Sequence, residues 1–218
     1  YVQGNFVWQD DVQDTKVNFV ASNSGRFLLH KNVDLSQDWN HVEGDEKKKP
    51  LNSNVVIGVD PFDHKTVDIV DQKRMSMGGC YGFHKYDGLD SDLSETFLFE
   101  YLARPDDPDD FYEDCLMASY FFGCKVLVEN NKSGFLNYFD RRGYSPWLIR
   151  PKGGRKTQRG ISAGVASKEQ LASAFASYIE NNTEKIIFPR LLNDLLDFDI
   201  QNSTKNDATM AGGWAIVA

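Results

Sequence analysis

Long apolar runs are absent from the sequence: no stretch approaches the roughly 18 residues that a membrane-spanning helix requires, and the N-terminus lacks the basic-then-apolar pattern of a secretory signal. Cysteine is scarce, and the three cysteines show no CxxC spacing. An odd number of cysteines argues against a disulfide framework, and the lack of CxxC spacing argues against a zinc ribbon. Both observations favour buried thiols in a reducing environment. A GxxxxGK motif followed by Ser or Thr is also missing, so we do not expect the chain to hydrolyse ATP.

An excess of acidic side chains gives the 218-residue chain a net charge of -8, which at first sight argues against a nucleic-acid partner. The charges are unevenly distributed, however. From Arg141 to Lys168 every charged residue is basic, whereas acidic residues gather between Asp87 and Asp114. This separation predicts a two-faced molecule, one part of which could receive a polyanion. Two solvated, charged loops would give the same pattern.

Residues 1–50 differ in character from the rest of the chain. Two strands are predicted there, at residues 16–20 and 26–30, on either side of a Ser-Asn-Ser-Gly turn. A polar, lysine-rich stretch from residue 43 to residue 50 follows. We therefore predict an N-terminal extension and linker over residues 1–50 and a single domain over residues 51–218.

From residue 55 onward the pattern changes to buried strands and amphipathic helices. VVIGVD and KVLVE are short apolar runs that suit buried strands, and each ends in an acid. Further strands are predicted at residues 66–70, 75–84 and 145–149. Helices are predicted at residues 109–122, 133–142, 167–182, 189–198 and 204–217. Strands first, alternation in the middle and helices last indicate an α/β fold in which helices cover a mixed sheet.

Two of the predicted strands end in carboxylates, Asp60 and Glu129. If these strands are parallel neighbours, both side chains emerge at the same edge of the sheet. A third acid, Asp207, stands near the start of the last predicted helix. That helix is rich in small residues that would let it approach the sheet closely: Ala208, Ala211, Gly212 and Ala215. Converging carboxylates of this kind suit phosphodiester cleavage by two divalent metals, because hard cations prefer oxygen ligands.

Each acid also has a purely structural interpretation. Asp60 precedes a proline and could simply start a turn. Glu129 could be a structural charge, although a Glu that directly follows an apolar strand is seldom buried without a partner. Asp207 lies three residues after Thr204, a spacing that resembles a capping box.

The runs VVIGVDP, VLVENNKSG and DFDIQNSTKNDATMAGGWAIVA, in this order, resemble the three acidic motifs in the nuclease domain of bacteriophage large terminase subunits. The stretches RGISAGVASKEQLASAFASYIEN and FPRLLNDLLDFD are also similar to that family. The resemblance covers residues 54–218, and the last motif is its most diagnostic part. It implies an RNase H-like fold, with a mixed central β-sheet flanked by α-helices and, here, an N-terminal β-containing extension.

Carried over residue by residue, the resemblance implies that Asp60, Glu129 and Asp207 are catalytic and bind two divalent cations, Mg²⁺ or Mn²⁺. Asp60 would bridge both cations. Asn206 stands where some relatives have another polar or acidic group, so its role stays open. Asp63 could bind a metal through water or could solvate a turn.

The resemblance further implies hydrolysis of double-stranded DNA with little sequence preference, because side chains that contact phosphates do not read bases. The loop PKGGRKTQRG and one lysine beside Glu129 supply the predicted DNA contacts: Lys132, Lys152, Arg155, Lys156 and Arg159. The implied role is to cut concatemeric genomes during packaging in the cytoplasm of the infected bacterial host. The implied partners are an ATPase motor domain of the same full-length protein and the portal and small terminase proteins, with no membrane.

Two other functions stay open. A different RNase H-like nuclease, such as a resolvase or a transposase, would share several acids. A transposase of the Asp-Asp-Glu type would need a Glu where this chain has Asp207, and a resolvase would work as a self-contained dimer. A non-catalytic docking module for portal or capsid proteins would need no cation and would have no reason to gather its carboxylates.

Overall fold

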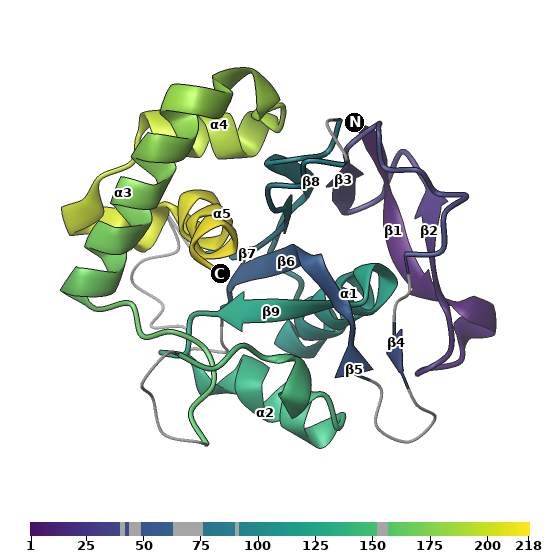
Figure 1. The fold of residues 1–218 in the computed structure, drawn as a ribbon. Helices are drawn as coiled ribbons and strands as arrows, with labels where there is room; N and C mark the ends of the chain where they lie inside the picture. The colour runs from purple at the N-terminus through teal and green to yellow at the C-terminus, as the bar shows by residue number, and fades with distance from the viewer. Residues whose placement is uncertain (40–41, 44–48, 63–75, 90–91, 152–156) are drawn as a thin grey trace.

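A computed structural model describes residues 1–39, 42–43, 49–62, 76–89, 92–151 and 157–218 of the chain. Within these residues, a mixed sheet carries helices on both faces, which confirms the predicted α/β class (Figure 1). The strands are β1 (Val2–Trp8), β2 (Val17–Ala21), β3 (Phe27–Leu29), β4 (Val42–Glu43), β5 (Lys49–Pro50), β6 (Asn52–Asp60), β7 (Gly78–His84), β8 (Thr96–Ala103) and β9 (Cys124–Val128). The α-helices are α1 (Pro108–Phe122), α2 (Ser133–Arg141), α3 (Val165–Asn182), α4 (Pro189–Leu196) and α5 (Asp207–Val217). The short 3-10 helices are η1 (Gln9–Asp11), η2 (Ser145–Trp147), η3 (Thr183–Lys185) and η4 (Ile200–Lys205).

The main sheet has the strand order β2-β1-β3-β8-β7-β6-β9, and β4 and β5 form a separate ribbon. The pairs β1–β2, β1–β3, β3–β8, β7–β8 and β6–β7 are antiparallel, whereas β6 and β9 run parallel. The parallel pair is possible because the chain passes through α1 between β8 and β9. The two runs VVIGVD and KVLVE are therefore neighbouring strands in the interior, as their apolar composition predicts.

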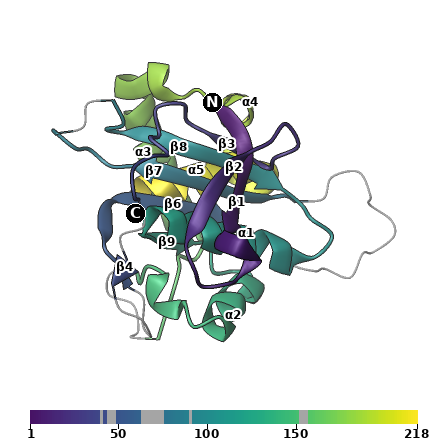
Figure 2. The same ribbon diagram turned by 90° about the vertical axis from the view of Figure 1, so that its right-hand side faces the viewer.

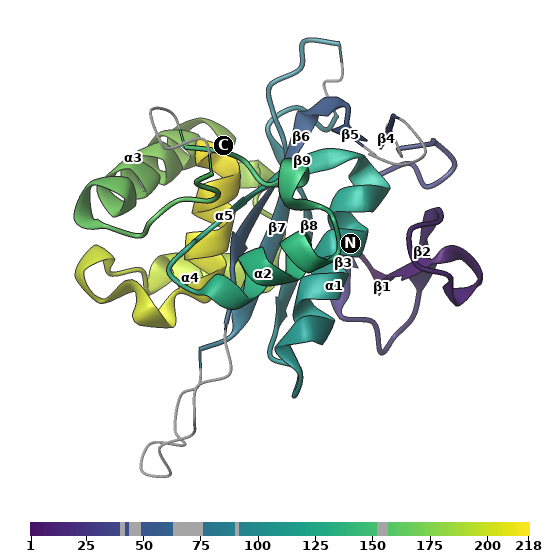
Figure 3. The same ribbon diagram turned by 90° about the horizontal axis from the view of Figure 1, so that it is seen from below.

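Helices cover both faces of the sheet (Figure 3). On one face, α1 and α2 pack over a core that includes Phe6, Phe99 and Phe122. On the other face, α5 lies against β6 and β7, and α3 and α4 cover it from outside. Because α5 is buried between two layers, nearly all of its residues are apolar or small.

The predicted helices are observed, and one begins later than predicted. The pattern over residues 204–217 divides into η4 and α5, because Asn206 has a non-helical backbone with φ -111° and ψ 50°. Helix α5 therefore starts at Asp207, whose side chain leaves from its first turn. None of the described helices is both long and apolar enough to cross a membrane.

The N-terminal segment continues the sheet of the following region. The predicted strands at residues 16–20 and 26–30 correspond to β2 and β3, but they do not pair with each other, because β1 lies between them (Figure 1). Figure 2 shows the N-terminal strands on the side that faces the viewer. Strand β3 in turn pairs with β8 through Phe27 and Tyr101. Neither β1 nor β8 is predicted from the sequence; β8 lacks alternation because it is buried on both faces, and Glu100 interrupts its apolar run.

One predicted strand is wrong. Residues 145–149 form η2 followed by Leu148, which makes only an isolated bridge to Val126. Pro146 explains the difference, because its fixed φ suits a helical turn and it has no N–H for a ladder. The strand predicted at residues 66–70 lies outside the described residues.

Candidate functional site

The parallel pair β6 and β9 places two acidic residues at the same edge of the sheet. Val59 pairs with Val128, and the N–H of Glu129 donates to the carbonyl of Val59 at 2.9 Å. Asp60 and Glu129 therefore lie at the same level on adjacent strands, and such strands are only about 4.8 Å apart. The condition set by the sequence, that the two strands be parallel neighbours, is therefore met.

Helix α5 crosses β6 and β7 and brings Asp207 to the same end of the sheet. Strand glycines allow this approach: a Cβ on Gly58 would overlap the carbonyl oxygen of Ala211, and a Cβ on Gly79 would collide with the carbonyl of Asp207. The prediction that small helix residues permit close packing is confirmed at Ala211 and Ala215. The glycines on β6 and β7 are as necessary for this close contact as the small residues of α5, and the helix pattern alone does not predict them.

The side chain of Asp207 is held by the segment that precedes β7. One carboxylate oxygen accepts from the hydroxyl of Ser76 at 2.8 Å, and the other accepts from the N–H of Met77 at 2.8 Å. Asp207 is thus tied to the sheet rather than only to its own helix. This arrangement differs from the capping-box interpretation, in which the carboxylate would turn back to the start of the helix.

Helix α4 anchors the beginning of α5 through Asp194. Its carboxylate accepts from the N–H of Thr209 at 2.6 Å and from the amide of Asn206 at 3.2 Å, and its carbonyl accepts from the same amide at 3.1 Å. The side chain of Asn206 is therefore engaged with α4. A carboxylate in this position also complements the positive end of the α5 dipole.

Lys132 supplies the positive charge nearest to the acids. Its ammonium lies 3.6 Å from a carboxylate oxygen of Asp60 and donates to the carbonyl of Pro61. The same ammonium lowers the pKa values of Glu129 and Asp207. Lys132, predicted as a phosphate contact, is in this structure an ion-pair partner within the acidic group.

Burial raises the pKa of Asp60 well above its ordinary value, the charge of Glu129 raises it further, Lys132 lowers it, and Asp207 adds to the rise. Burial also raises the pKa of Glu129, against the opposing effect of Lys132 and a hydrogen bond that the Asn131 amide donates at 3.0 Å. For Asp207, burial raises the pKa, and the hydrogen bonds from Met77 and Ser76 oppose it. Two buried acids and the partly buried Asp207, which repel one another, favour a neutralising cation between them.

Three residues near this site are not indicated by the sequence. The indole N–H of Trp214 is buried on the Glu129 side and lowers the pKa of that carboxyl, although within the described residues it meets no acceptor at hydrogen-bond geometry. The guanidinium of Arg104 stacks 4.6 Å from the centre of the Phe62 ring and donates to the carbonyl of Ser76. No motif points to Arg104 and Ser76, because they come from segments without regular spacing to the acids.

The chemistry of the donor set fits a hard divalent cation, since three carboxylates are gathered around one ammonium. Their present geometry is that of an ion-paired group: among the described residues, no set of three or more His, Cys, Asp or Glu side chains is arranged to hold a metal ion. Asp63 lies outside the described part of the chain.

The predicted DNA contacts are only partly described. Lys152, Arg155 and Lys156 lie outside the described residues. Arg159 is half-buried, and its guanidinium donates to the carbonyls of Ser145 and Gln158, both at 3.2 Å. Arg159 therefore braces the segment beside the loop that follows Glu129.

The expected separation of basic and acidic segments does not hold for the first two arginines of the basic run. Arg141 pairs with Asp109 at 2.6 Å. Arg142 pairs with Glu113 and, at 3.0 Å, with Asp14. The acid-rich and arginine-containing segments are thus brought together by the packing of α1 against α2, so the charge carried by these residues is used internally.

In comparisons with known proteins, the chain matches no family model and no curated protein.

Proposed function

We propose that this chain is a metal-dependent DNA endonuclease, the nuclease domain of a bacteriophage large terminase subunit with an RNase H-like fold. One observation carries the proposal: Asp60 and Glu129 leave adjacent parallel strands at the same level, and α5 brings Asp207 to them. The mixed sheet, with helices on both faces, supports the RNase H-like part of the proposal.

The three carboxylates would hold two divalent cations, Mg²⁺ or Mn²⁺. When bound, such ions supply an activated water and stabilise the leaving oxygen of an in-line displacement. The protein's own residues provide position and charge. Ser76 and Met77 fix Asp207, and Asn131 fixes Glu129.

Double-stranded DNA is the proposed substrate, held through its phosphates by Lys132 and by the loop residues Lys152, Arg155, Lys156 and Arg159. Contacts of this type imply little sequence preference. In the full-length protein this activity would cut concatemeric genomes next to an ATPase motor domain, with portal and small terminase proteins as partners, in the cytoplasm of the infected bacterium.

The test is a plasmid cleavage assay with the purified chain. Supercoiled DNA should be nicked or linearised with Mg²⁺ or Mn²⁺ and left intact in EDTA. Asp60→Asn keeps the shape and removes one proposed ligand, so cleavage should fall on the order of 10²-fold or more, since metal-bound charge contributes several kcal/mol. Retention of wild-type cleavage by a folded Asp60→Asn protein would remove Asp60 from the mechanism.

Two alternatives are separated by further measurements. Another RNase H-like nuclease, of the resolvase type, would prefer branched junctions over linear duplex and act as a dimer. A docking module for portal or capsid proteins is favoured by the ion pair of Lys132 with Asp60, which could be purely structural. Such a module would bind no Mn²⁺ in a calorimetric titration.

A further inference from the structure

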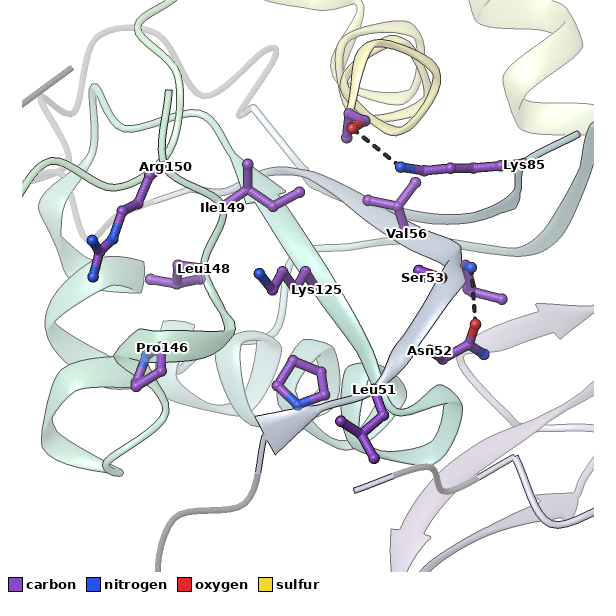
Figure 4. A pocket seen from close by; sticks show the side chains of 13 residues that line it. Leu51, Asn52, Ser53, Val56, Lys85, Lys125, Pro146, Leu148, Ile149 and Arg150 are labelled. Atoms are coloured by element: carbon purple, nitrogen blue, oxygen red, sulfur yellow. Dashed lines mark hydrogen bonds between the residues drawn. The ribbon is translucent and has the colours of Figure 1, made fainter. Parts of the chain in front are cut away.

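A basic cavity lies on the α5 face of the sheet, near the C-terminal end of that helix (Figure 4). Its volume is about 690 Å³, and its described lining contains three cationic side chains and no Asp or Glu. The cations are Lys85, Lys125 and Arg150, which come from segments far apart in the sequence. We call this feature the basic cavity.

An irregularity between β6 and β9 opens the cavity. Asn52 pairs with Cys124, and the next pair joins Val56 to Lys125, so the residues from Ser53 to Val55 bulge away from β9. A bulge of this kind bends its strand and leaves space beside the partner strand. Lys125 stands in that space with its side chain exposed.

Two of the three cations have no partner among the residues that the structure describes. The ammonium of Lys85 donates to the carbonyl of Ala218 at 3.2 Å, which satisfies it in part. Within the described part of the chain, neither Lys125 nor Arg150 makes an ion pair or a side-chain hydrogen bond, in contrast to Arg141 and Arg142. Both are exposed and line the same cavity, so an anion in the cavity would be attracted by both positive charges at once.

Strand β9 connects the basic cavity to the carboxylates and fixes the distance between them. Lys125 lies on β9 and Glu129 directly follows that strand, and their even spacing places both side chains on the same face. The intervening distance is about 13 Å, at about 3.3 Å per residue. Because base pairs are stacked about 3.4 Å apart, this spacing corresponds to roughly four base pairs of duplex. Residues 126–128 are buried between these two places, so a single duplex would reach both across the residues that cover β9.

We propose that the basic cavity binds the phosphodiester backbone of a nucleic acid at a point about four base pairs from the carboxylates. The inference rests on the proposed function, because it takes the nucleic acid at the carboxylates as its reference. Lys125 and Arg150 contact phosphates, and Lys85 is a third, partly satisfied cation. The cavity offers no aromatic ring and no acid among its described lining residues, so it grips the backbone and does not read bases.

The experiment measures binding of a fluorescein-labelled duplex of about 20 base pairs in EDTA, between 50 and 200 mM NaCl, so that no cleavage is needed. The variant is Lys125→Ala with Arg150→Ala. The matched control is Lys16→Ala with Lys31→Ala, which removes two exposed lysines of the N-terminal segment. All side chains replaced are exposed, so thermal melting should confirm that each protein remains folded.

Removing two phosphate contacts should reduce the slope of log K against log salt by about 1.8, at about 0.9 per contact. Over the stated salt range, the wild type should then lose about 12-fold more affinity than the cavity variant. The control should keep the wild-type slope. Asp60→Asn should bind the duplex at least as well as the wild type.

Several outcomes would overturn the inference. A wild-type slope in the cavity variant means that the cavity does not hold DNA. If labelled polyglutamate binds the wild type and not the cavity variant, while the duplex slope is unchanged, the cavity accepts an acidic protein segment instead. Failure of the wild type to bind duplex at 50 mM salt overturns both this inference and the proposed nuclease. A reduced slope without any metal-dependent cleavage supports the cavity and rejects the nuclease.

Discussion

The ammonium of Lys132 lies 3.6 Å from the carboxylate of Asp60, the most deeply buried of the three gathered acids. This contact places one positive charge beside the acids. The buried carboxylates of Asp60 and Glu129 and the partly buried carboxylate of Asp207 would repel one another, and a cation between them offsets that repulsion. In the proposed nuclease, the ammonium of Lys132 would supply the positive charge that a bound metal ion would replace.

Replacing Lys132 by Met should destabilise the metal-free protein. Breaking a buried ion pair from one side costs about 3–5 kcal/mol, and because the lysine is partly exposed we expect about 1–3 kcal/mol. Chemical unfolding in EDTA measures the change. Lys125→Met is the matched control, since that lysine is exposed and should change stability by less than about 0.5 kcal/mol. Equal stability of the Lys132→Met protein and the wild type would show that Asp60 does not need its partner.

The same substitution should strengthen binding of Mn²⁺, because a competing positive charge has been removed from the acids. Calorimetric titration of the wild type and Lys132→Met provides the comparison, with Lys125→Met again as control. A weaker Mn²⁺ affinity in Lys132→Met would mean that the lysine supports the metal rather than standing in for it.

Gly58→Ala should disturb the site through packing alone. A methyl group there would overlap backbone atoms of α5 at Ala211 and Ala215, and backbone cannot rotate away as a side chain can. We expect a loss at the upper end of the 1–3 kcal/mol that is typical of overpacking, roughly 3 kcal/mol. Cleavage should fall as well, because α5 carries Asp207.

Gly164→Ala is the control for this substitution. Nothing lies within 4 Å of a Cβ at Gly164, and its backbone conformation, with φ -82°, is open to any residue. Gly164 is the N-cap of α3, where Ala is less favourable than Gly, but Ala also lowers the entropy of the unfolded chain; these opposing effects should leave a change of less than about 1 kcal/mol. If Gly58→Ala were equally mild, the close approach of α5 to β6 would be incorrect.

The sequence was sufficient to predict two buried strands that each end in an acid, whereas their parallel pairing was only a condition of that argument and comes from the structure. Strands that are buried on both faces have a recognisable sequence, because VVIGVD and KVLVE must be apolar throughout. The acid that follows each apolar run then indicates where the strand ends. The start of α5 could be placed only approximately, because the break at Asn206 depends on its hydrogen bonds to Asp194.

The remaining features depend on contacts between distant segments. The insertion of β1 between β2 and β3 cannot be read from local pattern, since each strand has the same preferences in either order. Arg142 pairs with Glu113 and with Asp14, and these ion pairs join three segments of the chain. Basic and acidic residues that are separated in the sequence are therefore neighbours in the fold. The contact of Ser76 with Asp207 spans 131 positions and has no local signal.

The basic loop can be tested separately from the chemistry. Replacing Lys152, Arg155 and Lys156 by Ala should weaken binding of unrelated duplexes similarly and lower the salt slope by about 0.9 for each phosphate that is no longer bound. Mn²⁺ affinity should stay unchanged. Cleavage that falls through weaker binding should return at low salt or high protein concentration; a defect that resists both conditions would mean that the loop does something other than capture DNA.

Arg159→Ala should be tested on its own, because Arg159 donates to the carbonyl of Ser145 and sits beside the segment that follows Glu129. We expect it to lower thermal stability, which the other three substitutions should not do. If its effect were confined to the slope of log K against log salt, Arg159 would act as a phosphate contact, like Lys152, Arg155 and Lys156, and not as a structural residue.

Asp114 predicts a pH dependence of stability that is independent of the candidate site. This carboxylate is buried on α1, where it accepts from the guanidinium of Arg26 at 2.6 Å and from the hydroxyl of Tyr101 at 2.6 Å. Burial raises the pKa of Asp114 from its ordinary value of 3.8 to about 6, despite these two partners. The folded protein therefore binds this proton more tightly than the unfolded chain does.

The sign of the effect follows from this difference. Protonated Asp114 contributes stability that is fully present below pH 3.8 and is lost as the pH rises through about 6. Relative to Asp114→Asn, which cannot titrate, the wild type should lose about 2 kcal/mol of unfolding free energy between pH 4 and pH 7.5. Guanidinium unfolding of both proteins across this range gives the difference directly, and other titrating groups cancel between them. A difference that is constant, or that grows in favour of the wild type with rising pH, would show that Arg26 and Tyr101 outweigh burial and hold the carboxylate ionised.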